Sequence, residues 1–252
     1  MNIYFPIIAY GGVCRAEFAM SVASLFVKGP QQLGKCSFTS TAILFESLIP
    51  RARNAAAAAA LHYEADYLLF IDADVAFDPS DVIKLVSHDQ DVVCGLYAKK
   101  YYNKKKIKYL AEHQPDAFET DAWKALCTDF TTETDPRFIK SLRQGTKLLP
   151  VKYAATGFML IKTSVLKKII KARPDLKYNN DVDGYSKFKD FYNFFPSHIN
   201  SDTKKYESED YGFCNLWRSL GGIIYVDPSV KLHHYGSQAY PGDLQEQFKI
   251  FP

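Results

Sequence analysis

Two aspartates, Asp72 and Asp74, follow directly after the apolar run Tyr67–Ile71. A short apolar run bounded by polar residues predicts a strand that is buried on both faces. Carboxylates cannot lie in a core without a partner, so the pair belongs at the exposed end of that strand. Alternate strand residues point to one side, which places the two carboxylates about 6–7 Å apart. Hard oxygen ligands so placed suit a divalent cation whose coordination shell a phosphorylated substrate completes.

A second acidic pair, Glu209 and Asp210, lies among aromatic residues in the segment Tyr206–Phe213. One interpretation is an acidic first helical turn, which the helix dipole favours. The other is catalytic, because a carboxylate beside aromatic rings can hold a raised pKa and act as a general base.

Two consecutive histidines, His233 and His234, precede Tyr235 and Gly236. A lone histidine is more often a packed or surface residue than a ligand. Neighbouring strand residues face opposite sides, so at most one of the two can face a site. The functional interpretation is a neutral imidazole that binds a metal beside the carboxylates.

Two arginines and an asparagine, Arg51, Arg53 and Asn54, open an alanine-rich segment that is expected to be helical. Cations are unfavourable at a helix N-terminus. Both arginines therefore need an anion or an acidic side chain nearby, and an anion would also use the free N–H groups of the helix.

The elements that must position these residues alternate in type through the first hundred residues. Strands are expected at Ile3–Ala9, Cys36–Leu44, Tyr67–Ile71 and Asp91–Leu96. Helices are expected at Arg15–Val27, at Pro50–Tyr63 and from Pro79 onward, with Asp78 as N-cap. This alternation predicts a mostly parallel sheet with helices on both faces. In such sheets ligands bind beyond the carboxyl ends of the strands, where Asp72 and Asp74 lie.

The second half of the chain is less regular, and no repeat or linker divides it. Residues 174–207 predict a long loop or flap, and its aromatic side chains form either a small core or a platform for sugar rings. The other expected elements are a strand at Val151–Ile161, a helix from Thr163 to before Pro174, a helix at Glu209–Leu220, and short strands at Ile223–Val226 and Val230–His233.

The composition limits the possible classes of protein. The chain has 252 residues, 47% of them hydrophobic, and a net charge of +3, which is too small to indicate a polyanion binder by charge alone. Its five scattered cysteines include no CxxC pair and predict reduced thiols. Neither a signal peptide nor a transmembrane span is predicted. The lysine-rich segment Lys99–Lys108 is interpreted as a solvated loop rather than a nucleic-acid site.

Taken in order, these segments resemble a GT-A-type glycosyltransferase over nearly the whole chain. Leu232–Gly236 resembles the family's late segment with a metal-ligand histidine and aligns best on His234. The other matching segments are the first strand with Tyr10–Gly12 (nucleotide base), Pro50–Asn54 (the helix that contacts the donor), Phe70–Val75 (the DxD motif), Thr156–Lys162 (the strand beneath the donor sugar) and Glu209–Asp210 (the acidic pair whose second member is the base in inverting members).

The resemblance implies an α/β, GT-A-like Rossmann-type single domain spanning residues 1–252. Its central sheet would be mostly parallel, with a nucleotide-binding half at 1–100 and an irregular acceptor-binding half at 101–252. It implies transfer of a sugar from a nucleoside-diphosphate sugar, with a UDP-sugar favoured, to a hydroxyl of a glycan or glycoprotein, with Mn²⁺ or Mg²⁺ as cofactor. Inversion is favoured over retention, in which the acidic pair would orient acceptor and sugar instead. The closest resemblance is to small soluble enzymes of bacteria and large DNA viruses. The expected location is therefore the cytoplasm, or the host cytoplasm for a viral protein.

The resemblance also assigns roles to individual residues. Asp210 and Glu209 would be catalytic, and Asp72, Asp74 and His234 would bind the metal, Asp72 through water or by holding the ribose instead. The residues expected to bind the donor are Ala9, Tyr10, Gly11, Arg51, Arg53, Asn54, Asp72, Ala73, Lys99 and Gly157.

Two other functions remain open from the sequence. A phosphohydrolase of the haloacid dehalogenase type also places a DxD motif after a strand. However, it usually uses the first strand, whereas here the motif follows the third. A non-catalytic carbohydrate- or nucleic-acid-binding module could use the aromatic and lysine-rich segments instead.

Overall fold

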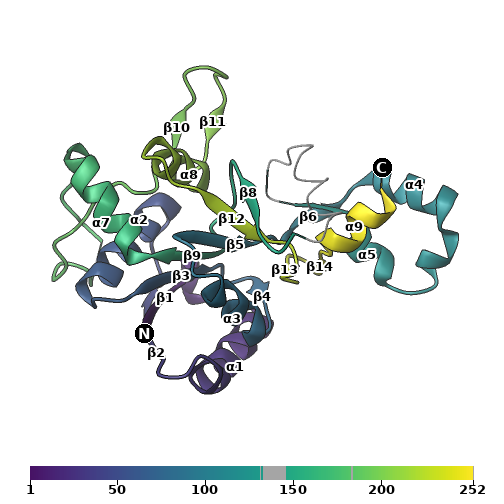
Figure 1. Ribbon diagram of the computed structural model, residues 1–252, viewed down its shortest axis with the longest axis horizontal. Helices are drawn as coiled ribbons and strands as arrows, with labels where there is room; N and C mark the ends of the chain where they lie inside the picture. Colours follow the sequence, from purple (N-terminus) through teal and green to yellow (C-terminus); the bar gives the residue numbers. More distant parts are fainter. Residues whose placement is uncertain (131, 133–145, 183, 252) are drawn as a thin grey trace.

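A seven-stranded sheet forms the centre of the computed structural model, which describes residues 1–130, 132, 146–182 and 184–251 (Figure 1). An arm of smaller elements extends from one end of the sheet. In spatial order the strands are β2 (Ser37–Ile43), β1 (Asn2–Ile8), β3 (Tyr67–Ile71), β9 (Phe158–Lys162), β5 (Val92–Gly95), β12 (Ile224–Asp227) and β8 (Leu149–Val151).

The sheet is mostly parallel, which confirms the prediction. Strands β2, β1, β3, β5 and β12 run in one direction. Strand β9 is inserted antiparallel between β3 and β5, and β8 pairs antiparallel with β12. The carboxyl ends of β1 and β3 therefore lie at the same edge of the sheet, where a ligand site is expected.

Helices cover both faces of the sheet because its central strands are apolar on both sides. In β3, Leu69 packs in the cluster of α1 (Ala16–Gln32) and α3 (Pro79–Ser87), whereas Leu68 and Phe70 pack in the opposite cluster. That opposite cluster belongs to α2 (Ile49–His62), α7 (Thr163–Ala172) and α8 (Glu209–Ser219). The alternation confirms that β3 is buried on both faces.

Helix α2 lies close to the sheet because its buried face consists of small side chains. Its alanines from Ala55 to Ala60 are at most 1% exposed. Alanine is also the strongest helix former, so local propensity and close packing agree in this segment. Helix α3 begins as predicted, with Asp78 and Asp81 forming a reciprocal capping box.

The arm and a second, smaller sheet complete the described chain. The smaller sheet has the order β14 (Ala239–Pro241), β13 (His233–Tyr235) and β4 (Val75–Ala76). The arm contains β6 (Ala98–Tyr102), β7 (Thr128–Phe130), α4 (Lys104–His113), α5 (Ala122–Leu126) and α9 (Leu244–Ile250). The remaining short elements are η1 (Tyr10–Gly12), η2 (Pro115–Phe118), η3 (Pro174–Leu176) and the hairpin of β10 (His198–Ile199) and β11 (Tyr206–Glu207).

Several predicted elements differ from the structure. The single strand predicted at Val151–Ile161 is wrong, because this segment contains the end of edge strand β8, a crossover and central strand β9. Helix α1 continues through Pro30 to Gln32 rather than stopping near Lys28, since Gly29 packs closely against Phe38 of β2. The last predicted strand also lies later than expected, at His233–Tyr235.

The aromatic side chains of the predicted flap do not form an exposed platform for sugar rings. They are at most 7% exposed and belong to the main core on the α2 side of the sheet. The core interpretation is therefore correct. The residues concerned are Tyr185, Phe188, Phe191, Tyr192, Phe194 and Phe195.

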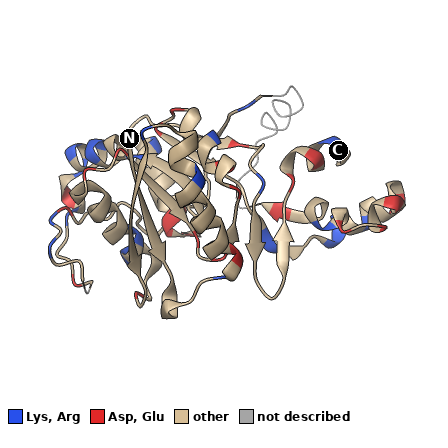
Figure 2. Ribbon diagram, turned by 90° about the horizontal axis from the view of Figure 1, so that it is seen from below, with Lys and Arg blue, Asp and Glu red and all other residues tan. Residues whose placement is uncertain are grey.

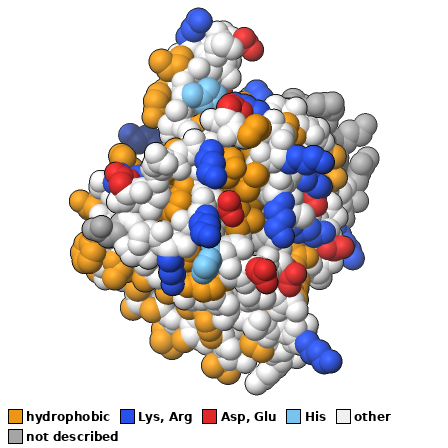
Figure 3. All heavy atoms as spheres, turned by 90° about the vertical axis from the view of Figure 1, so that its left-hand side faces the viewer, with side chains coloured by type: hydrophobic (Ala, Val, Ile, Leu, Met, Phe, Trp, Pro, Cys, Tyr) orange, Lys and Arg blue, Asp and Glu red, His pale blue; other side chains and the backbone are white. Residues whose placement is uncertain are grey.

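Acidic and basic side chains are interspersed along the described chain, and the arm carries both signs (Figure 2). On the face shown in Figure 3, apolar side chains lie between charged ones of both signs. The five cysteines are all free thiols, as predicted. Among the described helices, none is both long and apolar enough to cross a bilayer.

Candidate functional site

A cavity of about 560 Å³ opens at the carboxyl ends of β1 and β3. It combines the two DxD carboxylates with basic and apolar side chains from distant parts of the chain. Its lining residues are Ile8, Ala9, Tyr10, Val13, Cys14, Arg15, Ile49, Arg53, Asp72, Ala73, Asp74 and Glu209.

A tight turn between β3 and β4 presents the DxD motif to this cavity. The backbone N–H of Asp72 donates to the carbonyl of Gly157 (3.1 Å), and the N–H of Val75 donates to the carbonyl of Asp72 (3.0 Å). Strand β4 then pairs with β13, which sets His234 opposite Val75. The small sheet therefore brings the late histidine segment to the DxD turn.

Arg53 connects the first DxD aspartate with the acidic pair of α8. Its Nη2 lies 3.0 Å from Asp72 Oδ1 and its Nε lies 3.4 Å from Glu209 Oε1. Its guanidinium also lies over the Phe70 ring, 5.1 Å from the centroid. Burial lowers the pKa of Arg53, but Asp72 and Glu209 raise it by more, so the guanidinium remains charged. The two acids thereby satisfy the need for an anion that the sequence indicated for this arginine.

Each carboxylate oxygen of Asp74 contacts a different side chain. Lys100 Nζ donates to Oδ2 (2.5 Å), and His234 Nε2 lies 3.4 Å from Oδ1. Burial raises the pKa of Asp74, but its contacts with His234 and Lys100 outweigh that effect and lower it to about 2. Asp74 is therefore a carboxylate at any physiological pH.

The orientation of His234 suits a metal ligand. Its Nδ1 lies 2.8 Å from the carbonyl oxygen of Ala98, which can only accept, so Nδ1 carries a proton. In the neutral ring Nε2 then presents a lone pair toward Asp74, an arrangement that a shared cation stabilises. His233 is exposed and points away.

The donor set fits Mn²⁺ or Mg²⁺, with one carboxylate and one imidazole supplied by Asp74 and His234. Within the described residues, no group of three or more His, Cys, Asp or Glu side chains is arranged to hold a metal ion. A cation at this position would therefore depend on other ligands, such as diphosphate oxygens and water, to complete its shell.

The acidic pair occupies the first turn of α8, and its members have different partners. Glu209 pairs with Arg53 and lines the cavity. Asp210 accepts hydrogen bonds from the Ser208 hydroxyl and from the Tyr211 N–H (2.9 Å). Asp210 is therefore the member without a basic side-chain partner among the described contacts, although it does not line the cavity.

Gly157 leaves the space that the site needs. A Cβ at this position would lie 2.4 Å from Asp72 Oδ2 and 2.5 Å from Tyr97 Oη. Any larger residue would displace one of these groups. The position sits just before β9, the strand that resembles the one beneath the donor sugar.

The structure places five of the expected donor-binding residues outside the cavity lining, and one of them, Gly157, is connected to the cavity through its hydrogen bond to Asp72. Arg51 pairs with Glu46 and Asp181 instead (2.7 and 2.9 Å). Asn54 bonds to the side chain of Asn193 and to the Phe195 backbone. Gly11, with φ of +74°, forms the turn beside Tyr10. Lys99 lines a separate cavity of about 410 Å³ in the arm.

Two basic residues of the site were missed from the sequence. Lys100, rather than Lys99, lies beside Asp74, because alternate residues of β6 face opposite sides. Arg15 lines the cavity, its N–H donates to Ala73, and its side chain donates to the Gly236 carbonyl. Its position before α1, where a cation is unfavourable, was the available signal.

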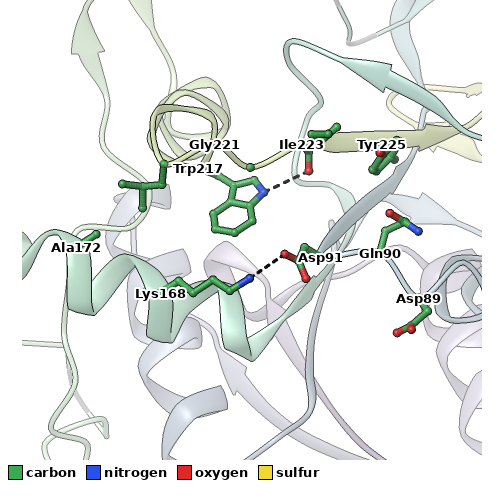
Figure 4. Close-up of a pocket in the computed structure, with 11 residues that line it drawn as sticks. Asp89, Gln90, Asp91, Lys168, Ala172, Trp217, Gly221, Ile223 and Tyr225 are labelled. Carbon is green, nitrogen blue, oxygen red and sulfur yellow. Dashed lines mark hydrogen bonds and ion pairs between the residues drawn. The ribbon is translucent and has the colours of Figure 1, made fainter.

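A larger cavity, about 670 Å³, lies away from the DxD motif (Figure 4). It is lined by Asp89–Asp91 and Gly221–Ile223, which precede β5 and β12, and so it opens at the amino edge of the sheet. Two of its polar contacts are internal: Lys168 pairs with Asp91 (3.1 Å), and Trp217 donates to the Ile223 carbonyl (3.2 Å). The smaller cavity at the carboxyl edge is therefore the candidate functional site.

Comparisons with known proteins give several structural matches and one family match. A crystal structure of GalNAc-T7 with UDP, GalNAc and Mn²⁺ aligns at a TM-score of 0.43 with 10% sequence identity. The alignment covers 92% of this chain and 43% of that one, so the chain spans less than half of that structure. No curated protein matches.

The sequence profile of the Anp1 family matches residues 46–184. This segment includes the start of α2, the DxD turn and β9, and it is more than half of the chain. The architecture is mixed α/β as predicted, with a large central sheet flanked by helices. The chain therefore belongs to the Anp1 family, a glycosyltransferase-like family.

Proposed function

We propose that the cavity at the carboxyl edge binds a nucleoside-diphosphate sugar together with Mn²⁺ or Mg²⁺, and that the protein transfers the sugar to a hydroxyl of a glycan or glycoprotein. A UDP-sugar is the favoured donor, and the transfer inverts the anomeric configuration. The first hundred residues would supply most of the donor site, since the cavity lining lies in residues 8–74 except for Glu209.

The orientation of His234 is the observation that carries this proposal. Its Nδ1 proton is fixed by Ala98, and Nε2 faces the permanently ionised Asp74. A carboxylate and an imidazole aimed at one point beside a cavity with two arginines favour a metal-bound diphosphate over a neutral ligand.

The chain's own residues have separable roles in such a transfer. Asp74 and His234 would hold the cation, which neutralises charge on the departing diphosphate. Asp72, fixed by Arg53, would orient the ribose. The acceptor hydroxyl would attack the anomeric carbon opposite the diphosphate and lose its proton to Asp210 as the bond to the diphosphate breaks.

Calorimetric titration with UDP and GDP, each with and without Mn²⁺, tests the proposal. We expect UDP to bind with Mn²⁺ and to lose most of its affinity in excess chelator or in Asp74→Asn. Equal affinity in chelator would overturn the metal requirement, and tighter binding of GDP would overturn the preference for uridine. Anomeric NMR of the product decides between inversion and retention.

A further inference from the structure

Lys100 forms an ion pair with Asp74, the carboxylate on which the proposed metal site depends. Its Nζ lies 2.5 Å from Asp74 Oδ2, while the other oxygen of Asp74 faces His234. Both side chains are about one-third exposed, at 37% and 34%, so solvent and ions reach the pair. A divalent cation that binds both oxygens of Asp74, or binds on the Oδ2 side, meets an ammonium group already in place.

Strand β6 aims Lys100 at this point. The Ala98 carbonyl accepts the hydrogen bond from His234, which fixes β6 beside the small sheet. Lys100 lies two residues further along and pairs with Asp74, whereas Lys99 lines the cavity of the arm. A Cβ at Gly236 would lie only 3.2 Å from Lys100 Cδ, so a glycine at position 236 leaves room for the lysine stem.

The ion pair between Lys100 and Asp74 can break and re-form easily. A partly exposed ion pair contributes little stability, and the four-carbon stem of lysine lets the ammonium move without a change in the backbone. Once a dication neutralises Asp74, the ammonium loses its partner and is repelled by the metal. The nearest new anionic partner would be the diphosphate that completes the metal's shell.

We propose that Lys100 competes with the divalent cation for Asp74 and, when displaced, binds the diphosphate of the donor. This inference rests on the proposed function, because it assumes a metal-bound diphosphate at the same cavity. The consequence is cooperative binding. The cation alone binds the protein weakly, and bound nucleotide raises the affinity of the protein for the cation. Lys100 would thus link occupancy of the metal site to the presence of donor.

The experiment compares Lys100→Met with wild-type protein in two calorimetric titrations. In the first, Mn²⁺ alone is added, and the variant should bind it about threefold or more tightly, because the competing ammonium is gone. In the second, UDP or GDP is added at saturating Mn²⁺, and the variant should bind the nucleotide about tenfold more weakly, since a charge-assisted hydrogen bond is lost. Tighter Mn²⁺ binding together with weaker nucleotide binding in the same variant is the result that supports the inference.

Two further variants serve as controls. Lys105→Met removes the same charge from an exposed position of α4 and should leave both affinities unchanged. Lys100→Arg keeps the charge and should keep nucleotide affinity within about threefold of wild type. A general loss of structure on replacing Lys100 would weaken nucleotide binding in this variant too.

Each outcome decides part of the inference. Mn²⁺ affinity that is unchanged or weaker in Lys100→Met overturns the competition. Tighter Mn²⁺ binding with unchanged nucleotide affinity overturns transfer of the ammonium to the diphosphate. If Lys99→Met produces both changes instead, the wrong lysine has been assigned. If neither nucleotide binds wild-type protein, the proposed function fails, and the Mn²⁺ titration still decides the competition.

Discussion

Neighbouring acidic residues in this site differ in what they contact, and that difference assigns their roles. Asp72 and Glu209 share the buried Arg53, so their charges are largely matched inside the protein. Asp74 faces groups that a ligand could replace, and Asp210 accepts only from Ser208 and Tyr211 in the described contacts. Asp74 and Asp210 are therefore the two acids for which substitution should affect the reaction most directly.

Replacing Asp210 with asparagine should abolish transfer and leave donor binding nearly unchanged. The amide keeps the size of the carboxylate but cannot accept the acceptor's proton, so the loss should be about 100-fold or more and fall on kcat. Steady-state kinetics with a UDP-sugar, beside UDP titration of the same variant, measures both effects. Transfer at close to the wild-type rate would remove Asp210 from the mechanism.

Replacing His234 with alanine should weaken Mn²⁺ and nucleotide binding together, because the cation loses its imidazole ligand. His233→Ala is the matched control, since His233 is exposed on the other side of β13 and should leave both affinities within about twofold. Metal titration of the two variants distinguishes them. Loss of metal binding in His233→Ala alone would show that the strand register is shifted by one residue.

Two short elements near the cavity, α3 and β4, differ in how far neighbouring residues determine them. Helix α3 carries its own start signal in the Asp78–Asp81 capping box and packs against α1 beside β4. Strand β4 has only two residues and exists because β13 pairs with it. The first element is fixed locally, whereas the second depends on a segment far along the chain.

Replacing Asp78 with alanine should lower the free energy of unfolding by about 1 kcal/mol, since the N-cap acceptor of α3 is lost. Hydrogen bonding from Ser80 lowers the pKa of Asp78. The cap is therefore at full strength above the unfolded-state pKa of about 3.9, and its contribution is lost as pH falls through the lower folded value.

Urea unfolding of Asp78→Ala at neutral pH and near pH 3 measures the effect. Ser80→Ala removes the Ser80 hydroxyl that also bonds to Asp78 but keeps the backbone N–H donor, so it should cost less stability than Asp78→Ala. A difference between Asp78→Ala and wild type that grows on acidification would contradict the assignment.

The whole molecule places two cavities at opposite edges of one sheet. The cavity at the carboxyl edge contains the DxD turn, and the larger one at the amino edge is lined in part by the paired side chains of Lys168 and Asp91. Both edges belong to a single layered core, so ligand binding at either one should stabilise the fold as a whole.

Mn²⁺ together with UDP should raise the melting temperature by about 5–10 °C at nucleotide concentrations near 100 times Kd. The shift should disappear in Asp74→Asn and persist in Lys168→Met, which alters the cavity at the amino edge. Differential scanning fluorimetry measures it. An equal loss of the shift in both variants would mean that the nucleotide does not bind selectively at the DxD cavity.

The sequence by itself determined the elements with strong local signals. The apolar run of β3, the alanines of α2 and the capping box of α3 are each specified by neighbouring residues, and all three elements form as predicted. The DxD pair at the end of a buried strand likewise indicated the edge of the sheet at which a polar cavity would open. Family resemblance added the late histidine, for which local pattern offered only a pair of candidates.

Tertiary structure decided which polar residues meet. Strand β9 enters the sheet antiparallel, a direction that its apolar composition cannot encode. Arg53 reaches the cavity whereas Arg51 does not, because two helical residue steps are about 200° of rotation. Lys100 reaches Asp74 and Lys99 does not, because the direction that each side chain of β6 faces is fixed only when β6 packs beside β13. Local sequence sets the period of a helix or strand, but the phase of that period relative to the site is set by long-range pairing.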